Sequence, residues 1–173
     1  MKLGFLTTAV IFIATNAISQ HAHTNSSALE TGQSQFAAIS EIVAILREDP
    51  KTDWAKIDID GLRSHLVDMD NVTTKAVVET TANAMTVTFL VTGNAAVAPS
   101  IQRMVLAHSP MLQQATGWSV KATEHADGAT MVVTLTSLNE MTEVTGLGFF
   151  GLMTIGAHHQ RHHLMIAQGN SPH

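Results

Sequence analysis

Hydrophobic positions recur every three to four residues in the first part of the chain, the periodicity of an amphipathic helix. This pattern predicts a first helix over residues 34–48, ended by Pro50. A second, shorter helix is expected to begin near Asp60, a residue type that caps helix N-termini. Its apolar stripe comprises Leu62, His65, Leu66 and Met69.

From Val72 the hydrophobic period changes to two, which is typical of β-strands. A hairpin is expected in which residues 80–83 form the turn. A third helix follows from Pro99 to Gly117, and Pro110 is expected to kink or break its last turn. The second hairpin is expected to turn at residues 126–128. The order of helix and hairpin thus repeats, which suggests a weak internal duplication.

The C-terminal part is predicted to be helical. Residues 137–140 match a capping box, and a helix is expected from there almost to Gly169. Residues 146–156 are apolar on all sides, so they should be buried or lie in an interface, and their glycines should permit a kink or a close neighbour. We therefore expect an α+β fold in the order helix-hairpin-helix-hairpin-helix, with a four-stranded, mainly antiparallel sheet and helices packed mostly on one face.

The first nineteen residues have the pattern of a cleavable signal peptide, with Lys2 before an apolar run and small residues before Gln20. A membrane anchor is the competing interpretation, but the run is shorter than the ~20 apolar residues that span a bilayer. We expect residues 20–34 to form a flexible lead-in, residues 35–169 a single domain and residues 170–173 a tail. The mature protein is then periplasmic or secreted, with no stable membrane span.

The amino-acid composition excludes several classes of functional site and partner. The chain has no cysteine, which excludes disulfides, thiolate metal sites and thiol catalysis. Its net charge is −5 and its nine Lys and Arg residues are scattered, so nucleic acid is not an expected partner. Ten histidines stand out against this background. Four aspartates cluster near the second helix, and we interpret them as capping and solvated residues: Asp58, Asp60, Asp68 and Asp70.

The strongest chemical signal is a run of histidines near the C-terminus. On a helix, His158 pairs with His162 and His159 with His163 at a spacing of four residues, close enough for two imidazoles to share a cation. The four rings span an arc of roughly 140°, so no more than two or three can bind one ion without help from another element. Apolar residues share this arc, so the rings are expected to face inward or into an interface.

Two further histidines, His65 and His108, each lie on an apolar helix stripe, where a neutral imidazole can complete a site that the last helix begins. Met69 lies one turn from His65, and Met104 and Met111 flank His108. A set of His and Met ligands suits copper, whereas three histidines with an open position suit zinc. The alternative for each lone histidine is a hydrogen-bonded core or edge residue.

Two short segments near the C-terminus resemble known sequence motifs. The C-terminal histidine pairs locally resemble the last helix of the DinB-like metal-dependent proteins, over about a dozen residues. The two predicted hairpins do not belong to that four-helix-bundle fold, so the resemblance carries no function to this chain. Residues 146–151 match the Gly-x-Gly-x-x-Gly pattern, but no second strand can follow, and a dinucleotide site is rejected.

The leading hypothesis is an exported metal-binding protein that holds copper or zinc through the C-terminal histidines. A second hypothesis is a non-metal binding or assembly module, in which the apolar helix from Leu147 to Ile166 forms a homo-oligomeric, pH-sensitive contact. A third is a metal-dependent enzyme, although the sequence identifies no catalytic residue. The metal candidates comprise His158, His159, His162, His163, His65 and His108.

Overall fold

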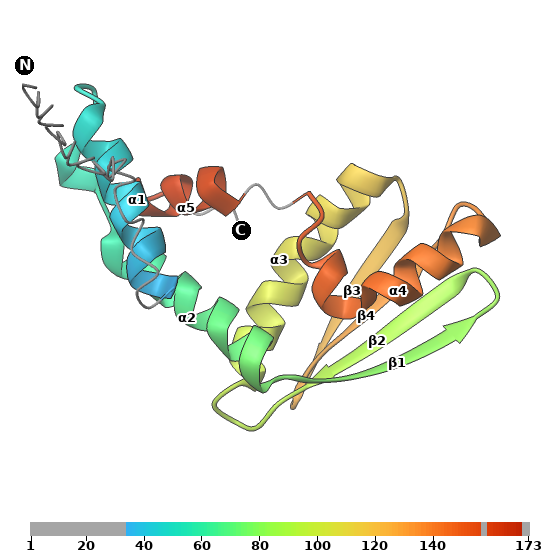
Figure 1. Ribbon diagram of the computed structural model, residues 1–173. Coiled ribbons are helices and arrows are strands. Elements are labelled where there is room, and N and C mark those ends of the chain that lie inside the picture. Colours follow the sequence, from blue (N-terminus) through green and yellow to red (C-terminus); the bar gives the residue numbers. More distant parts are fainter. Residues whose placement is uncertain (1–33, 157–158, 171–173) are drawn as a thin grey trace, which may run out of the picture. The chain divides into compact units, whose positions relative to one another are not determined.

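The computed structural model describes residues 34–156 and 159–170 (Figure 1). Within these residues, five α-helices accompany one four-stranded antiparallel sheet, which confirms the α+β class. The helices are α1 (Ser34–Glu48), α2 (Ile59–Lys75), α3 (Ala98–Thr116), α4 (Met141–Leu152) and α5 (His159–Ala167). The strands are β1 (Val77–Asn83), β2 (Thr86–Thr92), β3 (Ser119–His125) and β4 (Gly128–Thr134). The predicted signal peptide and most of the lead-in lie outside the described residues.

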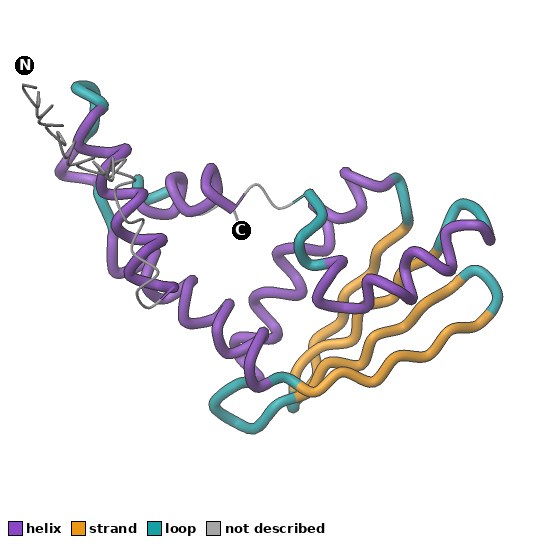
Figure 2. The backbone as a smooth tube through the Cα atoms, in the orientation of Figure 1, coloured by secondary structure: helices purple, strands orange, loops and turns teal. Residues whose placement is uncertain are grey.

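The two hairpins join into one sheet through their second strands, in the order β1-β2-β4-β3 (Figure 2). In the central pair Phe89 lies opposite Met131, and each hairpin closes through a loop of two residues. All three strand pairs are antiparallel. The edges of the sheet are therefore β1 and β3, the first strand of each hairpin.

Alternation along the central strands gives the sheet one buried face and one more open face. Val87, Phe89 and Val91 of β2 are fully buried, whereas the residues between them, such as Thr88 and Leu90, are partly or largely exposed. Successive side chains of a strand point to opposite faces, so this pattern separates a core face from a threonine-rich face. Both α3 and α4 contribute buried side chains to the core that contains these strand residues.

The described residues form two hydrophobic clusters. The larger one joins the sheet to α3 and α4 and includes the tilted ring pair of Phe89 and Phe149. The smaller one is built by α1, α2 and α5 around five buried residues: Ile42, Leu46, Leu62, Leu66 and Ala167. Met69 of α2 packs against both clusters. It therefore lies at their junction.

Element boundaries differ from the sequence prediction at two places around α2 and β1. The helix begins two residues earlier than expected, since Asp58 rather than Asp60 caps it and accepts a 2.7 Å hydrogen bond from the Gly61 amide. It also continues through Val72 to Lys75, because Val72 extends the buried stripe by three residues beyond Met69. The predicted strand start at Val72 is thus wrong.

The predicted position of the turn in the first hairpin is also wrong. Residues 80–83 belong to β1, and the chain turns instead at Ala84 and Met85. Ala84 adopts a positive φ of 51°, a conformation that sequence patterns assign to Gly or Asn. Because position 84 is neither Gly nor Asn, the sequence pattern placed the turn at residues 80–83, which end at Asn83.

The predicted C-terminal helix is not continuous. Gly148 has a non-helical backbone (φ 59°, ψ −174°) that kinks α4, and the chain leaves the helix after Leu152 before α5 begins. In contrast, α3 continues past Pro110 to Thr116, so the expected break does not occur. The capping box at Ser137 and Glu140 is present, although it caps a short 3₁₀ turn before α4. Among the described helices, none is long and apolar enough to cross a membrane.

Candidate functional site

Histidines from three helices gather at one place. His65 of α2 lies against both His162 and His163 of α5, with ring centroids 4.7 and 5.5 Å apart. The rings of His162 and His163 are 6.3 Å apart. On the outside of this group, His108 of α3 lies 6.2 Å from His162, and His159 lies 6.1 Å from His163. We call these five residues the histidine cluster.

The cluster is enclosed by protein. The exposed fractions of His65, His108, His162 and His163 are 9%, 4%, 8% and 6%. His159 is half-buried at one end of the group. His158 lies outside the described residues, so the pairing predicted for His158 and His162 stays a prediction. The pairing of His159 with His163 places two adjacent rings on one face of α5.

One atom of the cluster stands out by its environment. Nε2 of His163 is buried and makes no hydrogen bond to any part of the chain that the structure describes. Buried polar atoms in native proteins nearly always have a partner, and an exception commonly marks an unseen water or ion. This nitrogen is therefore a candidate for contact with a water molecule or an ion.

Burial also favours the neutral form of two of these rings. It lowers the pKa of His159, and burial together with the charge of His159 lowers the pKa of His163. Neutral imidazole retains a nitrogen lone pair, which is the form that binds metal ions. His159 and His163 therefore offer nitrogen donors at neutral pH.

A hydrogen bond fixes the tautomer of His108. Its Nδ1 lies 2.9 Å from the carbonyl oxygen of Met104, one turn earlier on α3. A carbonyl oxygen can only accept, so Nδ1 carries the proton and Nε2 carries the lone pair. Metal-binding histidines are commonly oriented by such a bond from the other ring nitrogen.

Local contacts bring α5 to α2. The amide of Asp58, at the start of α2, donates a 2.7 Å hydrogen bond to the carbonyl of Ala167 at the end of α5. Ala167 is fully buried in the smaller cluster. On the outer side of α5, the Gln160 side chain donates a hydrogen bond to Glu41 of α1. These contacts orient α5 so that His162 and His163 face α2.

The turn before α5 is held against α3 by a close backbone approach. Gly156 has a φ of 74°, and a Cβ atom there would lie 2.8 Å from the Met111 carbonyl oxygen. Only glycine fits this conformation and this contact without strain. The predicted role of the glycines, a kink or a close neighbour, is thus confirmed at Gly148 and Gly156.

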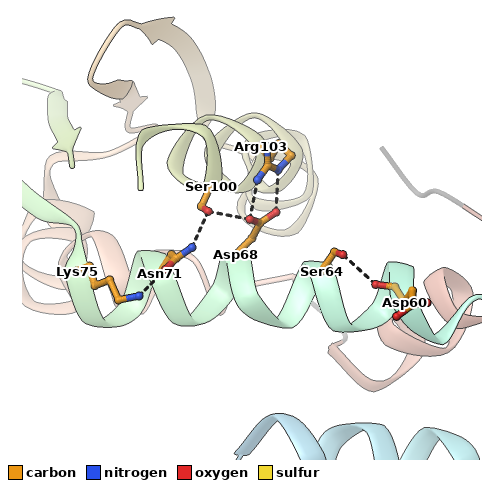
Figure 3. A network of polar contacts seen from close by, with 7 residues as sticks. All are labelled: Asp60, Ser64, Asp68, Asn71, Lys75, Ser100 and Arg103. Atoms are coloured by element: carbon orange, nitrogen blue, oxygen red, sulfur yellow. Dashed lines mark hydrogen bonds and ion pairs between the residues drawn. The ribbon is translucent and has the colours of Figure 1, made fainter. Parts of the chain in front are cut away.

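A polar network holds α2 to α3 beside the cluster (Figure 3). The Asp68 carboxylate accepts two hydrogen bonds from Arg103, of 2.8 and 2.7 Å, and a third of 2.7 Å from the Ser100 hydroxyl. Asn71 donates to the same hydroxyl and accepts from Lys75. Interpreting Asp68 as a capping or solvated residue was wrong, because its partners come from α3, 32 and 35 positions away.

Three pockets border the cluster. One of about 430 Å³ includes His162, Met111 and Met165 in its lining. A second of about 330 Å³ includes His65, Asp68 and Arg103. A third of about 140 Å³ includes His108 and His159. Each of these pockets is thus lined by one or two histidines of the cluster.

The separations between the imidazole rings can be related to those at a metal centre. Two imidazoles on one tetrahedral ion, with Zn–N bonds of about 2.0–2.1 Å, have ring centroids about 5 Å apart. The pairs of His65 with His162 and with His163 lie near this value. Within residues 34–156 and 159–170, however, no group of three or more His, Asp or Glu side chains has the geometry of a metal site. Binding of one ion by three of these side chains would therefore require them to move.

Comparison of the chain with profiles of known protein families, with curated proteins and with solved structures found no match. The geometry of the cluster is thus the observation that bears most directly on function.

Proposed function

We propose that this chain is an exported protein that binds a copper or zinc ion through histidines of α2 and α5. His65, His162 and His163 are the principal ligands, and His108, His159 and His158 are the candidates for completing the coordination. The observation that carries the proposal is the buried Nε2 of His163, which has no hydrogen bond in the described chain, on a ring whose centroid lies 5.5 Å from that of His65. A cation at this place would satisfy that nitrogen.

The donor set agrees with copper or zinc. The cluster supplies imidazole nitrogen donors, and the chain has no thiolate to compete with them. Magnesium and calcium prefer oxygen ligands and would find none among these rings. The ion would tie α5 to α2, and nothing in the cluster assigns a reaction to it.

The test is metal analysis of protein produced from the full chain. We expect one copper or zinc ion per molecule after dialysis, measured by plasma mass spectrometry, and saturable binding by calorimetry. The variant His65→Asn/His163→Asn should lose this ion. His125→Asn, at the end of β3, changes the described histidine that lies outside the cluster and should retain it. Retention of metal by the double variant, with a native circular dichroism spectrum, would contradict the proposal.

Export is a separate part of the proposal. It is supported by the apolar N-terminal segment and the small residues before Gln20. N-terminal sequencing of protein recovered from the periplasm or medium should begin at Gln20. Protein that keeps Met1 and remains with the cell membranes would indicate an uncleaved anchor instead.

The assembly hypothesis remains an alternative with an observation of its own. Leu147 and Phe150 of α4 are 42% and 43% exposed, so the apolar stretch presents side chains to the surface. His162 and His163, by contrast, face other helices of the same chain, which favours the metal over a histidine-containing interface. Sedimentation at about pH 7.5 and 5.5 distinguishes the two, because the alternative requires metal-free oligomers that dissociate on acidification.

A further inference from the structure

The smallest of the three pockets has a different chemistry from the rest of the cluster. It measures about 140 Å³, and its lining includes three thioethers and two imidazoles: Met69, Met104, Met153, His108 and His159. These residues come from α2, α3, α5 and the residue that follows α4. We call them the Met–His pocket.

The donors of this pocket are soft and uncharged. Thioether sulfur prefers copper(I) among the biological transition metals, and imidazole binds it as well. Met104 and His108 lie one turn apart on the same helix, and His108 Nδ1 donates a hydrogen bond to the Met104 carbonyl. A sulfur and a nitrogen donor of α3 therefore line the same small space.

The charge of the lining selects among cations. No carboxylate lines the pocket, and its remaining described neighbours are Val72, Thr73, Phe150 and Thr154. The cost of removing an ion from water rises steeply with its charge, so an uncharged, mostly apolar site disfavours divalent ions. A monovalent ion with an affinity for sulfur fits this environment better than zinc does.

The side chains are held in place but can adapt. Met104 and His108 are buried, and Met69 packs against both hydrophobic clusters. Methionine is unbranched and has several rotatable bonds, so its sulfur can shift without moving the backbone. The pocket can thus contract around an ion smaller than its volume.

We infer that the Met–His pocket binds copper(I), beside the imidazole site of the proposed function. The inference rests on that function only in expecting copper to be the metal that reaches this part of the chain. His108 and His159 are candidate ligands at both sites, whereas Met69 and Met153 are not among the proposed imidazole ligands, so substituting these two methionines tests the pocket separately.

The test uses silver(I) as a redox-inert substitute for copper(I), added to the full chain with ¹³C-labelled methionine methyl groups. We expect Ag⁺ to shift the methyl signals of Met69, Met104 and Met153, and calorimetry to give saturable binding. The variant Met69→Leu/Met153→Leu should lower the Ag⁺ affinity at least tenfold and leave Zn²⁺ binding unchanged. Leucine nearly conserves the volume of methionine, so the fold should be retained.

The matched control is Met111→Leu/Met165→Leu, which changes two methionines of the pocket of about 430 Å³ and should keep the Ag⁺ affinity. Unchanged Ag⁺ binding in Met69→Leu/Met153→Leu, or shifts confined to Met111 and Met165, would overturn the inference. Methyl shifts of Met69, Met104 and Met153 on addition of benzene but not of Ag⁺ would also overturn the inference. Loss of Zn²⁺ but not Ag⁺ binding in His65→Asn/His163→Asn supports both proposals. Ag⁺ binding at these methionines without any Zn²⁺ or Cu²⁺ binding contradicts the proposed function alone.

Discussion

Asp68 shows how one residue can hold the framework of the candidate site. Its carboxylate is 13% exposed and bonds to Arg103 and Ser100, whereas the Arg103 side chain is 61% exposed. Burial alone would raise the pKa of Asp68, but the hydrogen bonds from Arg103 and Ser100, with the charges of Arg103 and His65, outweigh it. The pKa of Asp68 therefore lies below its usual value. The ionised form stabilises the contact between α2 and α3.

Asp68→Asn should lower the free energy of unfolding by about 1–2 kcal/mol at pH 7, because a charge-assisted, partly exposed contact is lost. An unfolded aspartate titrates near pH 3.9 and the folded one at a lower pH, so this stabilisation is complete above about pH 4 and is lost as the pH falls through the folded pKa. Urea unfolding at pH 7 and pH 3 measures both effects.

The matched control is Asp60→Asn in the first turn of the same helix. Asp60 forms a 3.5 Å ion pair with Arg63, and both side chains are well exposed. Its loss should cost less than about 0.5 kcal/mol at either pH. Equal losses in the two variants would contradict the role assigned to Asp68.

At the scale of elements, the C-terminal segment depends on where glycine interrupts it. Apolar periodicity predicts helix across residues 137–169, because each piece is helical on its own. The glycines indicate where the segment can bend, but no local pattern encodes the contact that Gly156 makes with α3. The break gives α5 a direction of its own, toward α2.

Gly156→Ala should destabilise the protein by about 1–2 kcal/mol, because alanine is strained at positive φ and its methyl group meets the Met111 carbonyl. Zn²⁺ affinity should fall as well, since α5 carries two of the proposed ligands. Gly146→Ala is the control: that position lies within α4 and has open space around it, so alanine should stabilise by about 0.5–1 kcal/mol. Thermal unfolding and Zn²⁺ calorimetry of both variants check this.

Pro110 allows a second test on α3. The helix continues around it although proline lacks the amide hydrogen that would bond the carbonyl of Leu106. Pro110→Ala should therefore raise the unfolding free energy by about 1–3 kcal/mol. Pro99→Ala, in the first turn where proline is well tolerated, should change it by less than about 0.5 kcal/mol. A loss of stability in Pro110→Ala would show that the proline is required for packing.

For the whole molecule, the histidine cluster joins helices of both hydrophobic cores. α5 belongs to the smaller core and α3 to the larger one, while α2 contributes residues to both. A shared metal would link these parts and add its binding free energy to folding. Zn²⁺ at a hundred times its dissociation constant stabilises the folded state by about 2.7 kcal/mol.

The midpoint of thermal unfolding should accordingly rise by roughly 5–10 °C with saturating Zn²⁺, as expected for a chain of this size. His65→Asn/His163→Asn should show no such rise, while His125→Asn should respond like the unchanged protein. Scanning calorimetry with and without chelator provides the measurement. An equal rise in the double variant would place the stabilising ion elsewhere.

Much of this architecture follows from local patterns. The limits of α1, the cap of α3 at Gly117 and the second hairpin were predictable, because helix and turn signals agree there. The sequence also indicated His65 and His108 as candidate metal ligands, because each lies on the apolar stripe of a helix. Their approach to α5 was not predictable, since it depends on how three helices cross. Asp68 was missed for the same reason, as its partners lie on another helix.

The order of the strands has a consequence for the behaviour of the chain among its own copies. All the charged side chains of the sheet lie on the two edge strands: Glu79 on β1, and Lys121 and Glu124 on β3. The central strands β2 and β4 carry none. Charges on exposed edges discourage the addition of strands from neighbouring molecules, which is the route to aggregation. Because the hairpins join through β2 and β4, the uncharged strands lie in the centre of the sheet and the charged strands β1 and β3 form its edges. This order disfavours aggregation through the sheet edges.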